Sequence, residues 1–512
     1  MKYLFLFTVT PVQEFISQSR KLKDLFGSSY LLSEMSEIGL KICKREGAQE
    51  IFPLINEDNK SYPNRFLVEF KDKNLEEIKK IGNEIIKNLQ DYIGHLAEKE
   101  EAKLQLKNYF SYYWAISEIE KDYKEAFDNI EKRLAGAKNT KLFNQQEEIG
   151  EKCSICGERR YLYKNHSLLK KNEKLCGVCF IKRSHTKTSF DSTADVALKY
   201  IFDKIDRSSF NLLSKDAQLF FEENLTKNYF EKNNITFNLE ECKKEFKSFK
   251  EKLKENSLKQ TSYYAVIMFD GDSMGEWLSG KNLDDKKELK KFHNFLSKKL
   301  LNYSKQLKEL IKKYGIGVYA GGDDFLGFVS LPYIFDSLKE IKEKWDEIIN
   351  ESLKKEFQFI KDFTFSAGVV VAHYKTPLQY VLKEVREAEK NAKKLVNKNG
   401  IAFRVLKRSG EIREAKIKFD NLKNLNILYE LIKEDFSTNF IAVLEKEFFL
   451  LSEAKHKKLL KAELIRTLNR AKLKDYPNIE TFLTNFNEIL KNSFIRDSLE
   501  LLNITKFIKG QL

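Results

Sequence analysis

The sequence of 512 residues lacks any apolar run long enough to cross a membrane. The apolar opening, residues 3–7, is interrupted at Thr8 and Pro11, and no small-residue cleavage site of a secretory signal peptide follows it. We therefore expect a buried strand that runs into a helix near Val12, and no membrane partner.

Proline and cysteine are also scarce. No proline occurs between Pro63 and Pro332, and this long middle is rich in Lys, Glu, Leu and Phe, which predicts helices. Four of the six cysteines form two Cys-x-x-Cys pairs, so metal binding in a reducing cytoplasm is expected and a disulfide framework is not. The isolated Cys43 and Cys242 are expected in the core.

The charge balance favours an anionic partner. Lys and Arg number 91 against 76 Asp and Glu, a formal net charge of +15, which is typical of proteins that bind nucleic acid or nucleotides. Lysines spread over solvated helix faces would give the same balance, and charge alone leaves both interpretations open. With 42% hydrophobic residues the chain is not disordered, and its length predicts two to four domains.

The expected fold class is a multidomain α+β protein. Residues 1–150 mix strands at 3–9 and 65–70 with helices at 12–25 and about 74–105. The other expected units are a cysteine module with a helical insertion, a second α/β unit and a C-terminal helical bundle for packing or docking, at 151–255, 256–410 and 411–512.

The second α/β unit has the clearest order of elements. Strands at 263–269, 316–320, 325–331 and 363–372 alternate with helices at about 285–313 and 335–356 in a β-α-β-β-α-β series, and a helix (377–396) and a strand (401–406) follow. This series is that of a ferredoxin-like domain.

Three carboxylates are placed for metal binding in this unit. Asp270 ends the first strand, and Asp323 and Asp324 lie in the turn of the next hairpin, which this topology puts beside that strand. Two Mg²⁺ (or Mn²⁺) ions held by such carboxylates serve nucleotidyl transfer. Asp272 is the weaker candidate, because strand alternation points it to the other face.

Other residues near the turn fit the same chemistry. Gly321 and Gly322 permit positive φ and close approach to a ligand, and Gly271 leaves its carbonyl free for a metal. Lys393, on the following helix, is placed to reach a triphosphate, although alone it would be one solvated lysine among many. A Gly-Gly-Asp-Asp turn alone is often only a hairpin; the surrounding β-α-β-β-α-β frame favours the functional interpretation.

The two cysteine pairs predict a structural Zn²⁺ site. Cys153 and Cys156 are separated by 19 residues from Cys176 and Cys179, and paired knuckles at this spacing are typical of tetrahedral zinc. Gly157 and Gly177 suit the tight turns of such knuckles. Four thiolates fill the coordination sphere and leave no place for His166 or His185.

In these motifs the chain resembles the large, polymerase-like subunit of type III CRISPR effector complexes, in particular the III-B (Cmr) branch. The matching motifs, in order, are residues 3–16 with Arg20 and Asp24, residues 28–33, residues 63–66, the four cysteines, residues 270–275, residues 321–324 and residues 366–370. The likeness covers about 1–410; residues 411–512 agree only in position and helicity.

The resemblance implies two facing palm domains with ATP as substrate at their junction, and catalytic carboxylates only in the second palm. Aligning the first strands puts Thr8 or Val9 opposite Asp270, so the first palm would receive the acceptor nucleotide, with Ser28 and Ser29 as contacts. Guide RNA, target RNA and other subunits, including a small helical one, are the implied partners. No histidine is followed by Asp, so we expect no HD nuclease activity.

Three functions remain open at this point. The first is an RNA-activated nucleotidyltransferase that converts ATP into cyclic oligoadenylate, with Asp270 and Asp323 on the metals and Asp324 as a further ligand or as the residue that orients the attacking hydroxyl. The second attaches AMP to S-adenosylmethionine by the same chemistry. The third is a scaffold that only binds RNA. Diguanylate cyclases share the turn but not the upstream palm or the zinc module.

Overall fold

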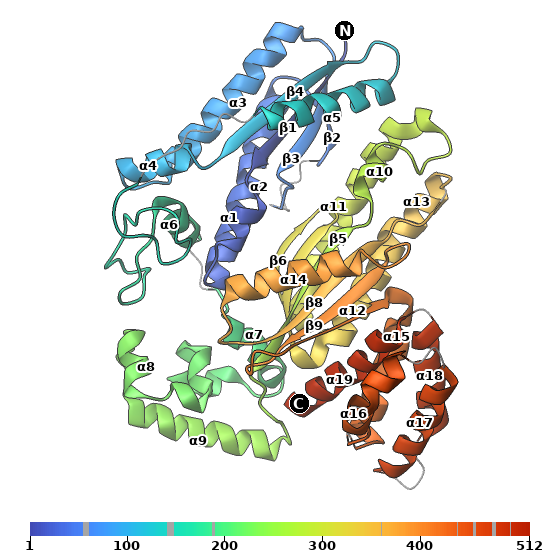
Figure 1. Cartoon of the computed structure of the whole chain (residues 1–512). Coiled ribbons are helices and arrows are strands. Elements are labelled where there is room, and N and C mark those ends of the chain that lie inside the picture. Colours follow the sequence, from blue (N-terminus) through green and yellow to red (C-terminus); the bar gives the residue numbers. More distant parts are fainter. Residues whose placement is uncertain are drawn as a thin grey trace.

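The computed structural model describes the chain apart from residues 55–60, 141–147, 187–189, 360, 438, 454–456, 474–477 and 492. Its described strands form two separate sheets, which are stacked along the long direction of the molecule (Figure 1). The upper part holds the N-terminal sheet, and the lower part holds the second sheet with the C-terminal helices beside it.

The N-terminal sheet has the antiparallel order β2-β3-β1-β4. Its strands are β1 (Tyr3–Thr10), β2 (Gln49–Phe52), β3 (Arg65–Phe70) and β4 (Ser111–Glu118). The helices of this part are α1 (Gln13–Ser17), α2 (Leu22–Arg45), α3 (Leu75–His95), α4 (Glu100–Lys107) and α5 (Tyr123–Asn139). Each of the two predicted helices, at 12–25 and 74–105, is therefore a pair of helices.

Strand β1 is buried on both faces, which explains its continuous apolar sequence. Phe5 and Phe7 belong to the core shared with α2 and α3, whereas Leu4 and Leu6 pack against residues of α5. Such a strand has no solvated face to carry the polar residues of an alternating pattern.

The second sheet has the order β10-β9-β8-β5-β7-β6. Its strands are β5 (Tyr263–Gly271), β6 (Gly315–Gly321), β7 (Asp324–Ser330), β8 (Phe365–His373), β9 (Gly400–Leu406) and β10 (Ile412–Lys418). Its helices are α10 (Met274–Leu278), α11 (Leu289–Tyr314), α12 (Ile334–Trp345), α13 (Glu351–Glu356) and α14 (Leu378–Ala392). The part β8-β5-β7-β6 has the ferredoxin-like order that the sequence predicts, and β2-β3-β1-β4 repeats it in the N-terminal sheet.

Two details of the second sheet differ from the prediction. The helix expected at 335–356 is divided by a π-helical turn at Asp346–Asn350. The sheet also continues past residue 410, because β10 pairs antiparallel with β9 after a turn at Gly410, whose φ is +90°. The sequence hides β10 because edge strands carry charged residues, here in Ile-Arg-Glu-Ala-Lys-Ile-Lys.

The remaining helices pack on both α/β units. Between the two sheets in sequence come α6 (Gly177–Ser184), α7 (Thr193–Phe202), α8 (Lys227–Lys232) and α9 (Leu239–Glu255). The C-terminal helices are α15 (Leu422–Glu434), α16 (Asn439–Glu453), α17 (Lys457–Arg470), α18 (Ile479–Lys491) and α19 (Ile495–Gln511). Helix α19 packs on β10, and the helices share one apolar core with α11 and α12.

The two α/β units touch through α11. This helix packs against β2 and α5 of the N-terminal unit. His293 of α11 makes a 2.9 Å hydrogen bond between Nδ1 and the Tyr123 hydroxyl, and Lys290 Nζ lies 2.5 Å from the buried carboxylate of Glu69. These contacts fix the N-terminal unit over the end of the second sheet that bears the β6–β7 turn.

Among the described residues, every helix is too short or too polar to span a bilayer.

Candidate active site and metal centre

The three predicted carboxylates come together at one end of the second sheet. Strand β5 pairs antiparallel with β7, and the last pair is Phe269 opposite Phe325. Asp270 comes directly after Phe269 and Asp324 directly before Phe325, so both aspartates lie at the same end of this strand pair. Oxygen atoms of Asp270, Asp323 and Asp324 lie within 4.8 Å of one another. The stacked rings of Phe269 and Phe325, with centroids 5.1 Å apart, form an apolar base beneath them.

The glycines around the cluster are required by space and conformation. A Cβ on Gly271 would lie 2.8 Å from Asp323 Oδ2 and 2.9 Å from Asp323 Cβ, closer than real atoms approach. Gly322 has φ of +76°, the left-handed region that glycine adopts without strain. Gly321 would meet the ring of Tyr319, whose hydroxyl donates to the Gly321 carbonyl at 3.2 Å.

The carboxylates oppose one another electrostatically. Burial and the nearby Asp270 raise the pKa of Asp323 to about 7, and burial with the charge of Asp323 raises the pKa of Asp324 well above its usual range. Burial also disfavours the ionised form of Asp270, but its hydrogen bond with Asp324 and the charge of Lys393 bring its pKa below the ordinary value. A cation at this position would allow all three groups to ionise.

The donor set fits a hard divalent cation. Carboxylate oxygens are the ligands that Mg²⁺ and Mn²⁺ prefer, and three aspartates leave coordination positions for water and phosphate oxygens. Asp270 and Asp324 lie on β5 and β7, and Asp323 lies in the tight β6–β7 turn, in close contact with Gly271 of β5.

The other predicted residues lie at different distances from this cluster. Lys393 Nζ contacts Asp270 and lies 2.7 Å from Glu389 Oε1; burial lowers the pKa of Lys393, but the two carboxylates raise it overall, so the lysine is charged. Ser29 lines a cavity that reaches Asp270. Ser28 is fully buried, and its hydroxyl donates to the Asp24 carbonyl at 2.7 Å.

Asp272 has a structural role. It is buried, and its carboxylate accepts hydrogen bonds from the hydroxyls of Thr364 (2.7 Å) and Ser366 (2.8 Å) and from the backbone N–H of Asn399 (3.0 Å). It lies apart from the three clustered carboxylates and joins the ends of β5, β8 and β9.

Two cavities open on either side of the turn, and the N-terminal unit lines both. One of about 390 Å³ is lined by Asp270, Asp324, Ser29 and Arg386 among others. The second, of about 260 Å³, contains Asp323 and Asp324 and is mostly apolar. Tyr62 and Asn64 of the N-terminal unit line the two cavities alike, so both units contribute to the site.

Arg386 is a residue that the sequence reasoning missed. It lies one turn of α14 before Glu389 and two turns before Lys393, and no described side chain forms an ion pair with it. Burial lowers its pKa, which marks a cation without a compensating carboxylate. The sequence did hold one signal for Arg386: the spacing of residues 386, 389 and 393 places Arg386 on the same helix face as the predicted Lys393.

The N-terminal unit has no carboxylates at the corresponding strand positions. The last pair between β1 and β4, Thr10 with Ser111, corresponds to Gly271 with Phe365 in the second sheet. Val9 therefore occupies the position of Asp270. Asp270 therefore has no counterpart on β1, as the alignment of the first strands predicts.

The four predicted cysteines also form a cluster. Sulfur atoms of Cys153, Cys156, Cys176 and Cys179 lie within 4.8 Å of one another, and the Sγ atoms of Cys156 and Cys176 are 3.8 Å apart. A tetrahedron with metal–sulfur distances of about 2.3 Å has edges of about 3.8 Å, so the thiols fit zinc.

The backbone is shaped for metal-bound sulfur. Cys153 Sγ accepts from the N–H of Ile155, and Cys176 Sγ from the N–H of Cys179, both at 3.4 Å. Gly157 has φ of +68°, as a knuckle turn requires. Gly177 is required for close packing and not for a turn, because a Cβ on Gly177 would lie 2.8 Å from the Cβ of Ala102 in α4.

The neighbouring histidines make other polar contacts, and the isolated cysteines lie in the hydrophobic cores. His185 Nε2 lies 2.6 Å from Glu34, and His166 Nδ1 accepts from the N–H of Leu168 at 3.2 Å. Cys43 and Cys242 are buried in apolar cores.

Comparison with known families matches both α/β units. The model of the Cas10/Cmr2 second palm domain matches residues 263–402, and that of the N-terminal region of CRISPR-associated protein Cmr2 matches residues 4–132. The CRISPR system Cmr subunit Cmr2 of Pyrococcus furiosus is 26% identical over 544 residues, covering 78% of this chain. The chain spans 61% of the length of that relative.

Solved structures share the fold at low sequence identity. Type III-B Cmr-beta in the apo state aligns over 99% of this chain and 82% of its own, with a TM-score of 0.69 and 15% identity. The form bound to cognate target RNA gives the same TM-score at 14% identity over 99% and 83% of the two chains. The Csm1–Csm4 cassette in complex with cA4 aligns over 99% and 70%, with a TM-score of 0.51 and 13% identity.

Proposed function

The chain is a Cmr2-like protein with a Cas10/Cmr2 second palm domain, and from this premise we propose that it is the nucleotidyltransferase subunit of a type III-B CRISPR effector complex. In this proposal the N-terminal unit is a first, degenerate palm. The reaction joins ATP molecules into a cyclic oligoadenylate after target RNA has paired with the guide RNA. Each step forms a phosphodiester bond between a 3′-hydroxyl and an α-phosphate and releases pyrophosphate.

The carboxylate cluster between two cavities carries this proposal. Asp270, Asp323 and Asp324 face a space that both α/β units line, so two nucleotides have room to meet at the carboxylates. Bound Mg²⁺ or Mn²⁺ would supply charge neutralisation and alignment of the attacking and leaving oxygens. The relative solved with cA4 is consistent with this product class.

The protein's own groups have separable tasks. Asp270 and Asp323 would hold the cations, and Asp324 would be a further ligand or would orient the attacking hydroxyl. Arg386 and Lys393, on one face of α14, would contact phosphate oxygens from the side opposite the apolar cavity. The apolar walls of the smaller cavity suit a purine ring.

The direct test is product analysis on the assembled complex with target RNA, ATP and Mg²⁺. The double variant Asp323→Asn/Asp324→Asn should lose messenger synthesis by about 10²-fold or more while keeping target RNA binding. The matched control is Asp284→Asn/Asp285→Asn, which changes an adjacent pair of exposed aspartates. Equal loss of synthesis in both variants, or parallel loss of RNA binding, would show that the central pair is structural.

The acceptor is tested in the same assay. Adding S-adenosylmethionine should leave the product unchanged if the acceptor is a second ATP. An adduct that forms only with S-adenosylmethionine would replace the cyclic product with the alternative chemistry, while the roles of the three carboxylates would stand.

A further inference from the structure

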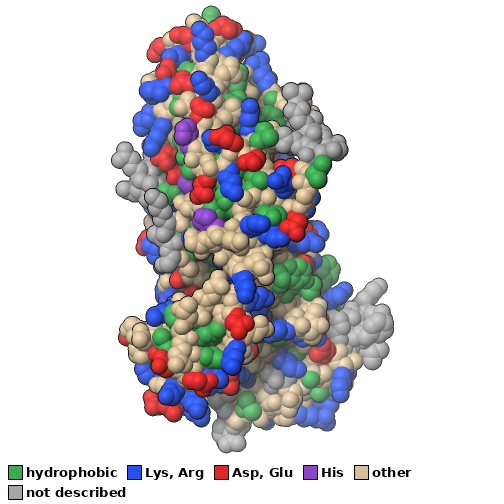
Figure 2. All heavy atoms as spheres, turned by 90° about the vertical axis from the view of Figure 1, so that its left-hand side faces the viewer, with side chains coloured by type: hydrophobic (Ala, Val, Ile, Leu, Met, Phe, Trp, Pro, Cys, Tyr) green, Lys and Arg blue, Asp and Glu red, His purple; other side chains and the backbone are tan. Residues whose placement is uncertain are grey.

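One lysine of the cysteine module is fully buried. Figure 2 shows Lys and Arg side chains over the whole height of one face of the molecule, whereas Lys182 on α6 has no exposed surface. Its Nζ donates to the backbone carbonyls of Phe15 (2.6 Å) and Gln18 (3.0 Å), and it lies 4.3 Å from the centroid of the Phe15 ring. Burying an ammonium group is costly, so a lysine whose described acceptors are backbone oxygens points to a specific task.

The two carbonyls belong to the end of α1. Five residues are too few for a helix that is stable alone, and the carbonyls of its last turn have no partners within the helix. An amine at this end satisfies them and suits the negative end of the helix. Lys182 therefore fixes the end of α1 from 164 residues away along the chain.

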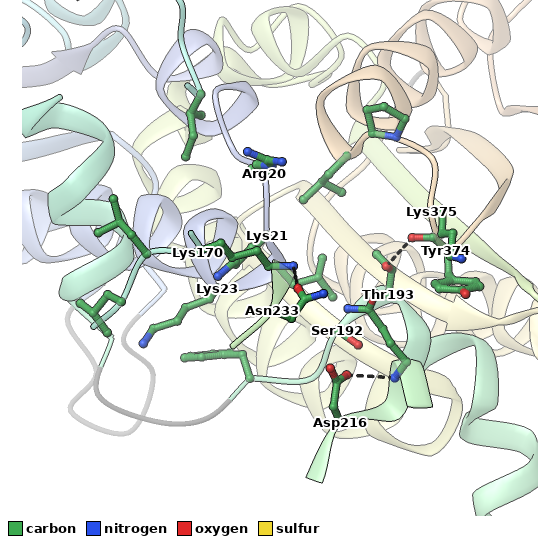
Figure 3. Close-up of a pocket in the computed structure, with 18 of the residues that line it drawn as sticks. Arg20, Lys21, Lys23, Lys170, Ser192, Thr193, Asp216, Asn233, Tyr374 and Lys375 are labelled. Carbon is green, nitrogen blue, oxygen red and sulfur yellow. Dashed lines mark hydrogen bonds between the residues drawn. The ribbon is translucent and has the colours of Figure 1, made fainter. Parts of the chain in front are cut away.

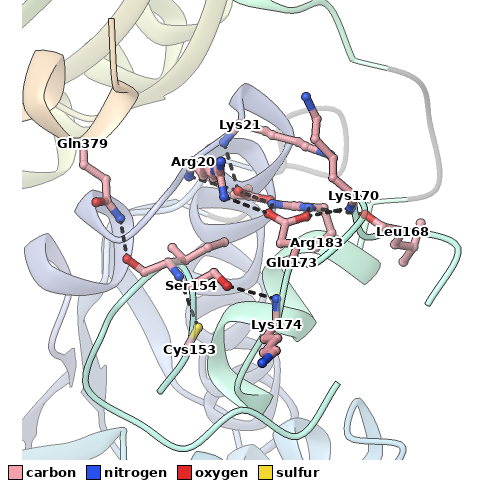
Figure 4. A network of polar contacts seen from close by, with 12 residues as sticks. Arg20, Lys21, Cys153, Ser154, Leu168, Lys170, Glu173, Lys174, Arg183 and Gln379 are labelled. Atoms are coloured by element: carbon pink, nitrogen blue, oxygen red, sulfur yellow. Dashed lines mark hydrogen bonds and ion pairs between the residues drawn. The ribbon is translucent and has the colours of Figure 1, made fainter. Parts of the chain in front are cut away.

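The next residue of α6 holds the start of α2 (Figure 4). The carboxylate of Asp24 accepts from the backbone N–H of Lys21 at 2.9 Å, and that of Glu173 accepts from the N–H of Lys170 at 3.0 Å. Arg183, whose side chain is 1% exposed, binds both carboxylates and so ties the two loops together. Lys21 and Lys170 consequently line one cavity of about 820 Å³, where Figure 3 shows them on the same side.

Helices α1 and α2 form one wall of the cavity beside the carboxylates. Gln13 and Ile16 of α1 and Ser29 of α2 line this cavity of about 390 Å³, which reaches Asp270. Helix α2 lies directly on α6, because a Cβ on Gly27 would clash with the carbonyl oxygen of residue 182. This wall is therefore held by α6.

Helix α14 forms another wall of the same cavity, with Arg386 and Glu389 among its lining residues. The start of α14 contacts the cysteine module, since the amide of Gln379 donates to the carbonyl of Ile155 at 3.0 Å (Figure 4). Ile155 lies between the first two cysteines, and its N–H donates to Cys153 Sγ. Both walls are thus attached to one module, and a metal at the four thiols would hold the two attachments in a fixed relation.

We propose that Lys182 is a positioning residue for the nucleotide cavity: by holding α1 on the cysteine module it sets the width of the cavity beside Asp270, while the contact between Gln379 and Ile155 sets the position of α14. This inference rests on the proposed nucleotidyl transfer and assigns control of substrate binding to a residue outside the cavity. The three carboxylates belong to the second sheet, so their geometry does not depend on Lys182. Loss of its amine should therefore affect the binding of ATP more than the chemical step.

The test compares Lys182→Met, which keeps the length of the side chain and removes the amine, with Lys509→Met. Lys509 is a matched control, because its Nζ also donates to two backbone carbonyls near the end of a helix, those of Ile432 and Phe436 at α15. The assembled complex with target RNA, ATP and Mg²⁺ gives KM and kcat. The full-length chain gives the affinity for 3′-deoxy-ATP, which lacks the 3′-hydroxyl needed for extension, and the hydrogen exchange of α1.

Lys182→Met should raise KM for ATP and the Kd of 3′-deoxy-ATP by about 10-fold, because a displaced wall loses contacts with the nucleotide, while kcat stays within about 3-fold of the wild type. Zinc content and Mn²⁺ affinity should not change. The amides of Ile16 and Gln18, which are hydrogen-bonded within α1, should exchange faster. Equal KM in the Lys182 and Lys509 variants would overturn the proposal. So would faster exchange with an unchanged KM, because Lys182 would then only stabilise α1.

Gln379→Ala is an independent variant that decides the matter if Lys182→Met loses zinc or fails to fold. It should raise KM by about 2- to 10-fold, the loss expected for one neutral hydrogen bond. Its control is Gln260→Ala, which removes an amide that donates to the carbonyl of Phe220 at 2.8 Å, and equal KM in these two variants would overturn the proposal. If the wild-type complex makes no messenger, the proposed function fails, and the affinities for 3′-deoxy-ATP then decide this proposal alone.

Discussion

Replacing Gly271 by Ala tests whether the position of Asp323 controls the reaction. The added Cβ would lie 2.8 Å from Asp323 Oδ2 and 2.9 Å from Asp323 Cβ, whereas ordinary contacts begin at 3.4 Å. The carboxylate must therefore retreat by about half an ångström or more, and a displacement of about 1 Å at a reacting centre can cost about 10²-fold in rate. Gly271 is not a positive-φ glycine, so its backbone accepts alanine.

The assay is the rate of messenger synthesis by the assembled complex with target RNA and ATP, together with Mn²⁺ binding by the full-length chain. We expect Gly271→Ala to lower the rate by about 10- to 100-fold and to weaken Mn²⁺ binding, with little change in melting temperature. The matched control is Gly275→Ala, because nothing lies within 4 Å of a Cβ at that helical position. A Gly271→Ala variant with the wild-type rate and Mn²⁺ affinity would refute the reasoning that Asp323 holds a catalytic cation.

Three further predictions concern other parts of the molecule. Arg386→Gln should reduce kcat/KM for ATP by about 10- to 100-fold, which is the loss expected for a hydrogen bond to a charged phosphate, without lowering the melting temperature. Its control is Lys390→Gln, which removes a lysine paired with Glu387. Equal kcat/KM in the two variants would contradict the phosphate contact of Arg386. Cys176→Ser should remove about one zinc per chain by elemental analysis and lower the melting temperature, whereas Cys43→Ser should leave the zinc content unchanged. His293 is buried, and burial lowers its pKa to about 4, so the stability from its neutral form is complete above about pH 6.5 and is lost as pH falls towards 4. Denaturant unfolding should therefore show the stability of His293→Gln falling by about 3 kcal/mol less than that of the wild type between pH 7 and pH 4, and parallel pH dependence of the two would contradict this.

The sequence alone determined the elements whose signals are local. The apolar runs of β1 and β5 predict buried strands, the two cysteine pairs predict one cluster, and the glycines around Asp323 and Asp324 predict a turn. The order of elements between 263 and 372 then predicts that Asp270 lies beside that turn, since the ferredoxin-like topology pairs the first and third strands. Motif likeness predicts the family in the same way.

Only the tertiary structure decided which charged residues have partners. Arg386 and Lys393 are both cations in the same stretch of sequence. Lys393 contacts Asp270, whereas Arg386 faces a cavity without a counter-ion. Asp272 follows Asp270 by two residues, yet three hydrogen bonds make it a structural link. Lys21 and Lys170 meet across 149 residues because Arg183 binds the acids that hold both loops. Burial and pairing depend on contacts between distant segments, and composition records the charges without recording what neutralises them.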